Sequence, residues 1–194
     1  AYTPLHHLLL AEEAAPKALV MTSGNASASP ICIGNEEALQ RLHGLADFFL
    51  LHNRDILTRV DDSVVRVMAG VPRLIRRARG FAPAPLPLTT LPRPCRDTLA
   101  CGAAMKNTFC IVRNNEAYLS QHIGELSNTE NYDFYLESIG HLKDVLECEP
   151  ERVVCDLHPD YLSSRYARRQ TNKLIQVQHH HAHALAVMAE HGLD

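Results

Sequence analysis

Several features that mark common protein classes are missing from this sequence of 194 residues. None of its six cysteines belongs to a CxxC pair, which argues against a zinc ribbon or zinc finger within the chain. No apolar run approaches the ~20 residues of a membrane span, and no signal peptide is visible. The sequence also lacks an internal repeat and the broad basic surface that nucleic-acid binding usually needs. We therefore expect neither a membrane nor a nucleic acid as a partner.

The overall composition is that of a soluble globular protein. Apolar residues make up 46% and charged residues 21%, and the length suits one or two domains. The cysteines are scattered, and some stand in apolar runs such as residues 108–112. Such thiols are typically buried and reduced, so we expect a reducing compartment and a cytoplasmic protein.

A proline-rich stretch divides the chain. Residues 82–94 contain five prolines, and proline has a fixed φ and no backbone donor. This stretch is therefore excluded from central strands and helix interiors and is expected to be an extended linker. We predict one domain part over residues 1–82, a linker over 83–95, and a second domain part over 96–194.

Both halves show alternating helix and strand signals, which predicts the α/β class. In the first half, apolar spacing predicts helices at residues 6–15 and 36–46. Strands are predicted at residues 18–22, 48–51, 63–68 and 73–75, the last two forming a hairpin. In the second half, three strands are predicted at residues 98–101, 108–113 and 116–120, with a tight turn at Asn114 and Asn115.

The remaining signals predict a parallel βαβ unit. Residues 127–130 have the pattern of a capping box, so a helix should follow and end near Pro150. After it come a strand, a helix, a strand and a helix, at residues 152–155, 161–169, 173–177 and 180–191. This spacing favours two parallel strands joined by a crossover helix.

A histidine cluster at residues 179–183, with four His in five positions, is the strongest chemical signal. His179 and His183 are four residues apart at the start of a predicted helix, so they share one face and can hold one metal ion. Asp156 and His158 follow the neighbouring predicted strand, which puts them at the same sheet edge. The competing interpretations are a purification tag and a solvated surface cluster, and we favour a functional site.

Several polar residues suit an anionic or small polar ligand. Ser23 and Asn25 follow the predicted strand 18–22, and Arg54 follows the strand 48–51. Arginine forks match phosphate-like anions, so Arg76 and Arg79 beside the hairpin are candidates, although a solvated charged hairpin is an equal alternative. Lys106 stands in a small-residue turn between strands, where backbone N–H groups can approach phosphate, but most such turns are only turns.

These motifs together resemble the HypF family of hydrogenase-maturation carbamoyltransferases. The first half resembles the later part of its YrdC-like domain. The second half resembles the start of its TsaD/Kae-like domain, which has an actin-like ATPase fold. The motifs that carry the likeness lie at residues 22–25, 52–54, 61–66, 75–80, 102–110, 119–124, 156–161 and 177–183.

The resemblance implies a two-step reaction. ATP and carbamoyl phosphate give carbamoyl adenylate, and the carbamoyl group then passes to the C-terminal cysteine of a HypE-type partner. It also implies a divalent metal, zinc or iron, at His179 and His183, magnesium with ATP, and a nucleotide or carbamoyl group at Ser23 and Asn25. The family's other ligands and domains are absent from the sequence, so we expect this chain alone to be inactive. The alternatives are a protein of tRNA threonylcarbamoyl-adenylate synthesis and a binding scaffold without activity.

Overall fold

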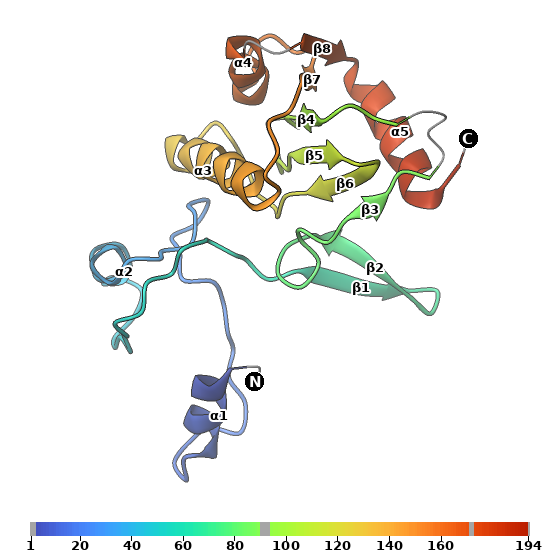
Figure 1. Cartoon of the computed structure of the whole chain (residues 1–194). Coiled ribbons are helices and arrows are strands. Elements are labelled where there is room, and N and C mark those ends of the chain that lie inside the picture. The colour runs from blue at the N-terminus through green and yellow to red at the C-terminus, as the bar shows by residue number, and fades with distance from the viewer. Residues whose placement is uncertain (1–2, 90–93, 171–172, 194) are drawn as a thin grey trace.

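The computed structural model describes residues 3–89, 94–170 and 173–193. A mixed sheet packed against helices occupies the C-terminal half, and a more open region precedes it (Figure 1). The elements, in order, are α1 (Pro4–Ala11), α2 (Asn35–Leu42), β1 (Val64–Met68), β2 (Val71–Arg76), β3 (Leu86–Pro87), β4 (Thr98–Ala100), β5 (Cys110–Arg113), β6 (Glu116–Leu119), α3 (Thr129–Val145), β7 (Arg152–Asp156), α4 (Leu162–Arg169), β8 (Lys173–Val177) and α5 (His179–His191).

The main sheet has six strands in the order β3-β6-β5-β4-β7-β8. Strands β4, β5 and β6 pair antiparallel, and the turn between β5 and β6 uses Asn114 and Asn115 at positive φ, as predicted. Strands β4, β7 and β8 are parallel neighbours, and α4 connects β7 to β8. The predicted βαβ unit is confirmed, and it brings the C-terminal ends of β7 and β8 side by side.

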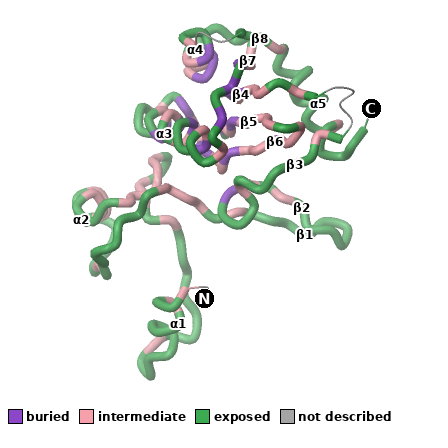
Figure 2. Tube along the Cα trace, viewed as in Figure 1, coloured by how far each residue is buried: buried purple, intermediate pink, exposed green. Residues whose placement is uncertain are grey.

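One apolar core lies between the sheet and its helices, where buried residues concentrate (Figure 2). Tyr135 of α3 is fully buried, its ring meets Phe109 edge-on at 5.8 Å, and its hydroxyl donates to the Cys101 carbonyl oxygen at 3.1 Å. Helix α3 starts one residue later than the predicted capping box implies. Asn128 is the N-cap, and its side chain accepts from the Glu130 N–H.

The region before the sheet differs from expectation at two points. Residues 18–22 and 48–51, predicted as strands, are not strands in the structure. Val20 and Phe48 are almost fully exposed, at 104% and 94%. Strands need a partner for their backbone hydrogen bonds, and among the described residues no other strand pairs with either segment. The predicted hairpin of β1 and β2 is confirmed.

The proline-rich stretch does not remain wholly outside the sheet. Leu86 and Pro87 pair with β6 as an edge strand, so this part of the expected linker adds to the sheet. An edge position leaves one side of the strand without a ladder, which is where proline is tolerated. Residues 90–93 of this stretch lie outside the described residues, and the domain boundaries at 82–83 and 95–96 stay predictions.

The length and polarity of the helices decide whether any of them could cross a membrane. Within residues 3–89, 94–170 and 173–193, none of the helices combines the length and apolar character that a membrane crossing requires.

Candidate functional site

Asp156 and His179 meet at the C-terminal edge of the sheet. Asp156 is the last residue of β7 and pairs with Val177 at the end of β8, and His179 opens α5 two residues later. The Nδ1 atom of His179 lies 2.7 Å from Oδ2 of Asp156. The parallel register of β7 and β8 therefore produces the predicted juxtaposition.

The two histidines of the predicted metal pair converge. The Nε2 atoms of His179 and His183 are 3.1 Å apart, and their rings meet edge to face at 79°. Two imidazole nitrogens bound to one tetrahedral ion at ~2.0–2.1 Å would lie roughly 3.3 Å apart. When Nδ1 of His179 donates to Asp156, its Nε2 presents a lone pair, which is the tautomer that metal binding needs. The pair thus fits a divalent ion.

A complete metal centre is not formed by the described residues alone. No group of three or more His, Cys, Asp or Glu among them could hold a metal ion. Asp156 contacts the far nitrogen of His179, so it serves to orient that ring. Any third ligand must come from outside this set, from substrate or from water.

His158 does not join the pair, although its predicted position is at the same edge. Its ring stacks on Tyr161 at 4.2 Å, and its Nδ1 accepts from the Asp160 N–H. Only its backbone N–H reaches the site, donating to Oδ1 of Asp156 at 2.8 Å. Partial burial alone would raise the pKa of the Asp156 carboxyl, but the hydrogen bonds from His158 and His179 lower it below its usual value.

Ser23 and Asn25 line a cavity of about 270 Å³ between the N-terminal region and the sheet. The Ser23 hydroxyl donates to Oδ1 of Asn25 at 2.5 Å, and Nδ2 of Asn25 donates to the Ser29 carbonyl oxygen at 2.8 Å. Arg76 lines the same cavity. The structure therefore brings three of the predicted ligand-binding residues around one space.

The arginine candidates are paired with carboxylates or lie away from this cavity. Arg76 pairs with Asp61 at 2.8 Å, and Arg79 pairs with Asp62 at 3.2 Å and donates to the Val60 carbonyl oxygen. Arg54 is exposed and does not line the cavity that holds Ser23 and Asn25. The carboxylates that precede the hairpin thus neutralise the two arginines that were expected to bind an anion.

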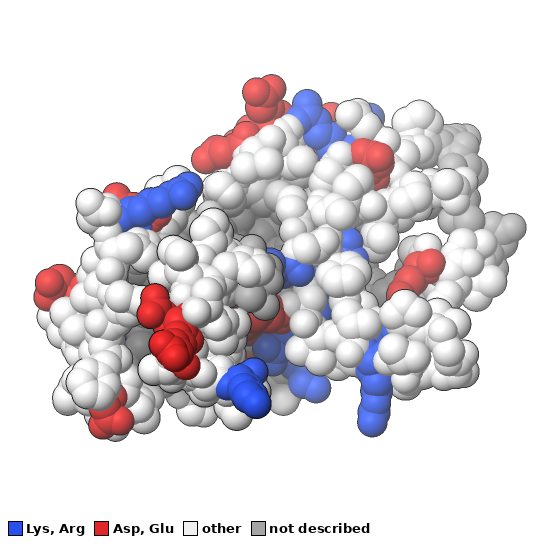
Figure 3. Space-filling model, turned by 90° about the horizontal axis from the view of Figure 1, so that it is seen from below, with Lys and Arg blue, Asp and Glu red and all other residues white. Residues whose placement is uncertain are grey.

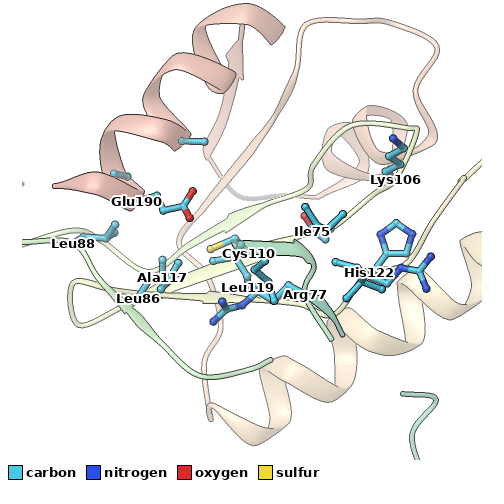
Figure 4. Close-up of a pocket in the computed structure, with 16 residues that line it drawn as sticks. Ile75, Arg77, Leu86, Leu88, Lys106, Cys110, Ala117, Leu119, His122 and Glu190 are labelled. Carbon is cyan, nitrogen blue, oxygen red and sulfur yellow. The ribbon is translucent and has the colours of Figure 1, made fainter. Parts of the chain in front are cut away.

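Lys106 stands in a tightly built turn between β4 and β5. Gly102 has a φ of +71°, and a Cβ there would come within 2.1 Å of the Thr108 carbonyl oxygen, so no other residue fits without rearrangement. Asn107, buried, donates to the Cys101 and Ala103 carbonyl oxygens and closes the turn. Lys106 itself has a φ of +49° and lines a second, larger cavity (Figure 4).

Gln121 and His122 are site residues that the sequence reasoning did not select. The Gln121 amide donates to the Arg59 carbonyl oxygen and accepts from the Asp61 N–H, and His122 lines both cavities. Burial lowers the pKa of His122, and the charges of Arg76 and Lys106 add to this against the opposing effect of Asp61. The signal in the sequence that could have indicated these two residues is their polar character directly after strand β6.

Polar contacts join the N-terminal region to α3. Arg41 pairs with Glu130 at 2.6 Å, Arg59 pairs with Glu137 at 2.9 Å, and Nδ2 of Asn131 donates to a backbone carbonyl oxygen of the N-terminal region. Basic and acidic side chains are also interspersed among uncharged ones on the face in Figure 3, which carries no broad basic surface among its described residues. Ion pairs and a side-chain hydrogen bond thus link the N-terminal region to α3.

Known proteins match both halves. A family model described as HypF Kae1-like domain matches residues 93–190, and one of the Sua5/YciO/YrdC group, described as telomere recombination, matches residues 1–78. The chain is 50% identical over its whole length to "Carbamoyltransferase HypF" of Synechocystis, covering 25% of that protein. It is 46% identical to "Carbamoyltransferase HypF2" of Cupriavidus necator, covering 26%.

A solved structure agrees with these relatives. The crystal structure of a full-length HypF in a phosphate- and nucleotide-bound form superposes with a TM-score of 0.84 at 48% identity, over 89% of this chain and 27% of that one. The predicted α/β fold with YrdC-like and Kae1-like parts is thereby confirmed. The chain spans about a quarter of the length of the curated relatives it matches. It belongs to the HypF family of carbamoyltransferases.

Proposed function

We propose that this chain is part of a carbamoyltransferase of [NiFe]-hydrogenase maturation that uses ATP and carbamoyl phosphate. Carbamoyl phosphate, ATP and water give carbamoyl adenylate, phosphate and pyrophosphate. The thiolate of the C-terminal cysteine of a HypE-type partner then attacks the carbamoyl carbon and displaces AMP. The family membership supports the reaction class, and the free thiols among the described residues suit a cytoplasmic setting.

The observation that carries the transfer step is the convergence of His179 and His183 beside Asp156. The two Nε2 atoms would hold a divalent ion, zinc or iron, which supplies Lewis acidity toward phosphate or carbamoyl oxygens. Asp156 fixes the tautomer and orientation of His179 through its Nδ1 atom. Hydrogen bonds at both carboxylate oxygens keep Asp156 ionised, so that it continues to accept from the imidazole.

The residues proposed for the first step surround the smaller cavity. Ser23 and Asn25 present a hydroxyl and an amide, which suit the polar edges of a nucleotide or carbamoyl group. Arg76 is held by Asp61 on the cavity wall, so it offers directed N–H groups with little net charge. Magnesium would accompany ATP and neutralise its phosphates.

The test uses the full-length protein that contains this chain. It is incubated with ATP and carbamoyl phosphate, and pyrophosphate release is followed together with carbamoyl transfer to the partner peptide. We expect pyrophosphate release that depends on carbamoyl phosphate. Release that depends instead on bicarbonate and threonine would favour tRNA threonylcarbamoyl-adenylate synthesis, which the match of residues 1–78 to the Sua5/YciO/YrdC group makes the second candidate. No release under either condition would leave a binding scaffold and refute the proposal.

A further inference from the structure

The smaller cavity is lined from both regions of the chain. Ser23, Asn25 and Arg76 belong to the N-terminal region, whereas residues 121–125 and Asn131 belong to the sheet region. The sheet region therefore forms one wall of a space whose ligand-binding candidates all lie in the N-terminal region. What its polar groups contact decides what this wall contributes.

The Gln121 side chain holds the backbone beside Asp61 with both ends of its amide. Its Nε2 donates to the Arg59 carbonyl oxygen, and its Oε1 accepts from the Asp61 N–H at 3.3 Å. Gln121 is itself fixed, because the Ser120 hydroxyl donates to its carbonyl oxygen at 2.8 Å. A carboxamide carries a donor and an acceptor side by side, so it matches a carbonyl and an N–H two residues apart.

The next residue holds the other side of the Asp61–Arg76 ion pair. The His122 backbone N–H donates to the carbonyl oxygen of Arg77, the residue after Arg76, at 2.9 Å. Nη1 of Arg76 in turn donates to Oδ2 of Asp61 at 2.8 Å. Two consecutive residues of the sheet region thus fix both chain segments that carry the pair. This restricts the arrangements open to two side chains that are 40% and 31% exposed.

Asn131 makes a similar contact on the opposite wall. It is buried, and its Nδ2 donates to the Glu125 carbonyl oxygen at 2.9 Å and to the Ala28 carbonyl oxygen at 3.2 Å. Ala28 has a φ of +63° and precedes Ser29, whose carbonyl oxygen accepts from the Asn25 side chain. The sheet region therefore also holds the turn that orients Asn25.

We propose that Gln121 is a positioning residue for the first reaction step. It acts through Asp61, whose carboxylate aims the N–H groups of Arg76 at the cavity, and Asn131 acts in the same way on Asn25. This inference rests on the proposed function, in which the cavity takes the nucleotide or carbamoyl group. The groups that touch the ligand stay in the N-terminal region, and the sheet region supplies their alignment.

The experiment measures pyrophosphate release by the full-length protein as a function of carbamoyl phosphate concentration. Gln121→Met keeps the length of the side chain and removes both hydrogen bonds, so it should lower kcat/KM roughly 10-fold. Gln170→Met is the matched control. The Gln170 amide donates to the Tyr166 carbonyl oxygen at the end of α4, and Gln170 does not line the cavity. This variant should keep the wild-type kcat/KM.

A double-mutant cycle tests whether Gln121 acts through the ion pair. Asp61→Ala removes the carboxylate that links Gln121 to Arg76. In that background, Gln121→Met should lower kcat/KM by less than about 2-fold, because the two changes break the same connection. A loss of the same size in both backgrounds would mean that Gln121 supports the structure in general, and it would overturn the inference.

Gln121→Glu separates hydrogen bonding from packing. The shape is nearly unchanged, and the Asp61 N–H keeps an acceptor, but an ionised carboxylate cannot donate to the Arg59 carbonyl oxygen. A role in packing alone predicts wild-type kcat/KM for this variant, whereas we expect a loss comparable to that of Gln121→Met. Wild-type kcat/KM in either variant would overturn the inference.

Hydrogen exchange followed by mass spectrometry examines the contact without relying on activity. Peptides that contain residues 59–62 should exchange faster in Gln121→Met than in the wild type, and peptides of β5 should not change. Unchanged exchange at residues 59–62 would overturn the positioning role. A wild type that releases no pyrophosphate with carbamoyl phosphate would instead refute the proposed function, and with it any use of Gln121 in that step, even where the exchange shows the contact.

Discussion

Residues 3–82 and residues 94–193 are built in different ways. Ala78 is the one buried residue among the first, whereas the apolar core of the second extends from Leu99 to Ala167 (Figure 2). The sheet region is thus specified by its own packing. The N-terminal region is positioned by backbone hydrogen bonds and by ion pairs to α3, so its arrangement depends on contacts that water and salt weaken.

The largest contrast should appear between two phenylalanines. Phe109 is 1% exposed and Phe48 is 94% exposed. Phe109→Ala should destabilise the sheet region by about 3–5 kcal/mol, because a buried ring leaves a cavity beside Tyr135. Phe48→Ala should change stability by less than ~0.5 kcal/mol. Denaturant unfolding followed by tyrosine fluorescence measures both, and similar effects would mean that the N-terminal region has packing that the structure does not show.

Alanine substitutions at two glycines of the sheet region should change stability in opposite directions. Gly102→Ala should destabilise by well over ~1 kcal/mol, because its φ is positive and the new methyl group would collide with the Thr108 carbonyl oxygen. Gly140 lies within α3 with open space around it, so Gly140→Ala should stabilise by about 0.5–1 kcal/mol. Thermal unfolding of the two variants should give Tm shifts of opposite sign, and a Tm for Gly102→Ala at or above that of the wild type would contradict the tight turn at Gly102.

Asp156 makes the stability of the sheet region depend on pH. The pKa of its carboxyl is lowered in the folded state, so its contribution is present above the unfolded value of ~3.9 and is lost as pH falls through the folded pKa. Asp156→Asn should therefore be less stable than the wild type at pH 7, by roughly 1–2 kcal/mol for two partly solvated charged hydrogen bonds. The gap should close below pH 4. A gap that persists unchanged at pH 3 would show that the ionised carboxylate is not its source.

The ion pairs between the regions should have the smallest effect on stability. Glu137→Ala, which removes the half-exposed partner of Arg59, should cost about 0.2–1 kcal/mol. It should nevertheless speed proteolysis within residues 3–82, and added salt should have the same effect on the wild type. Arg96→Ala breaks a more exposed pair within the sheet region and should leave this proteolysis rate unchanged. Equal rates for both variants would contradict the electrostatic docking of the N-terminal region.

The same division explains what the sequence could predict. The strands around Asn114 and Asn115 and the parallel pair β7 and β8 follow from local signals and were predicted closely. Residues 18–22 have a strand-like pattern, but a strand also needs a partner, and pattern alone does not supply one. Local sequence signals predicted the elements of the sheet region correctly. They failed for segments whose conformation depends on a partner elsewhere in the chain.

The candidate site divides in a similar manner. The convergence of His179, His183 and Asp156 follows from helix spacing and from the sheet register, so it was accessible from the sequence. The orientation of His158 was not, because stacking on Tyr161 decides it. Nor was the pairing of Arg76 with Asp61, because these residues are distant in sequence and meet only when the hairpin forms.

Under the proposed function, the N-terminal region and the sheet region contribute to two separable steps. Pyrophosphate release and carbamoyl transfer to the partner peptide, measured in the same reactions of the full-length protein, test it most directly. Asn25→Ala in the N-terminal region should reduce both, because transfer depends on the adenylate. His179→Ala in the sheet region should keep pyrophosphate release near the wild-type rate and abolish transfer. Loss of pyrophosphate release in His179→Ala, or normal transfer by that variant, would contradict the division of the two steps between the regions.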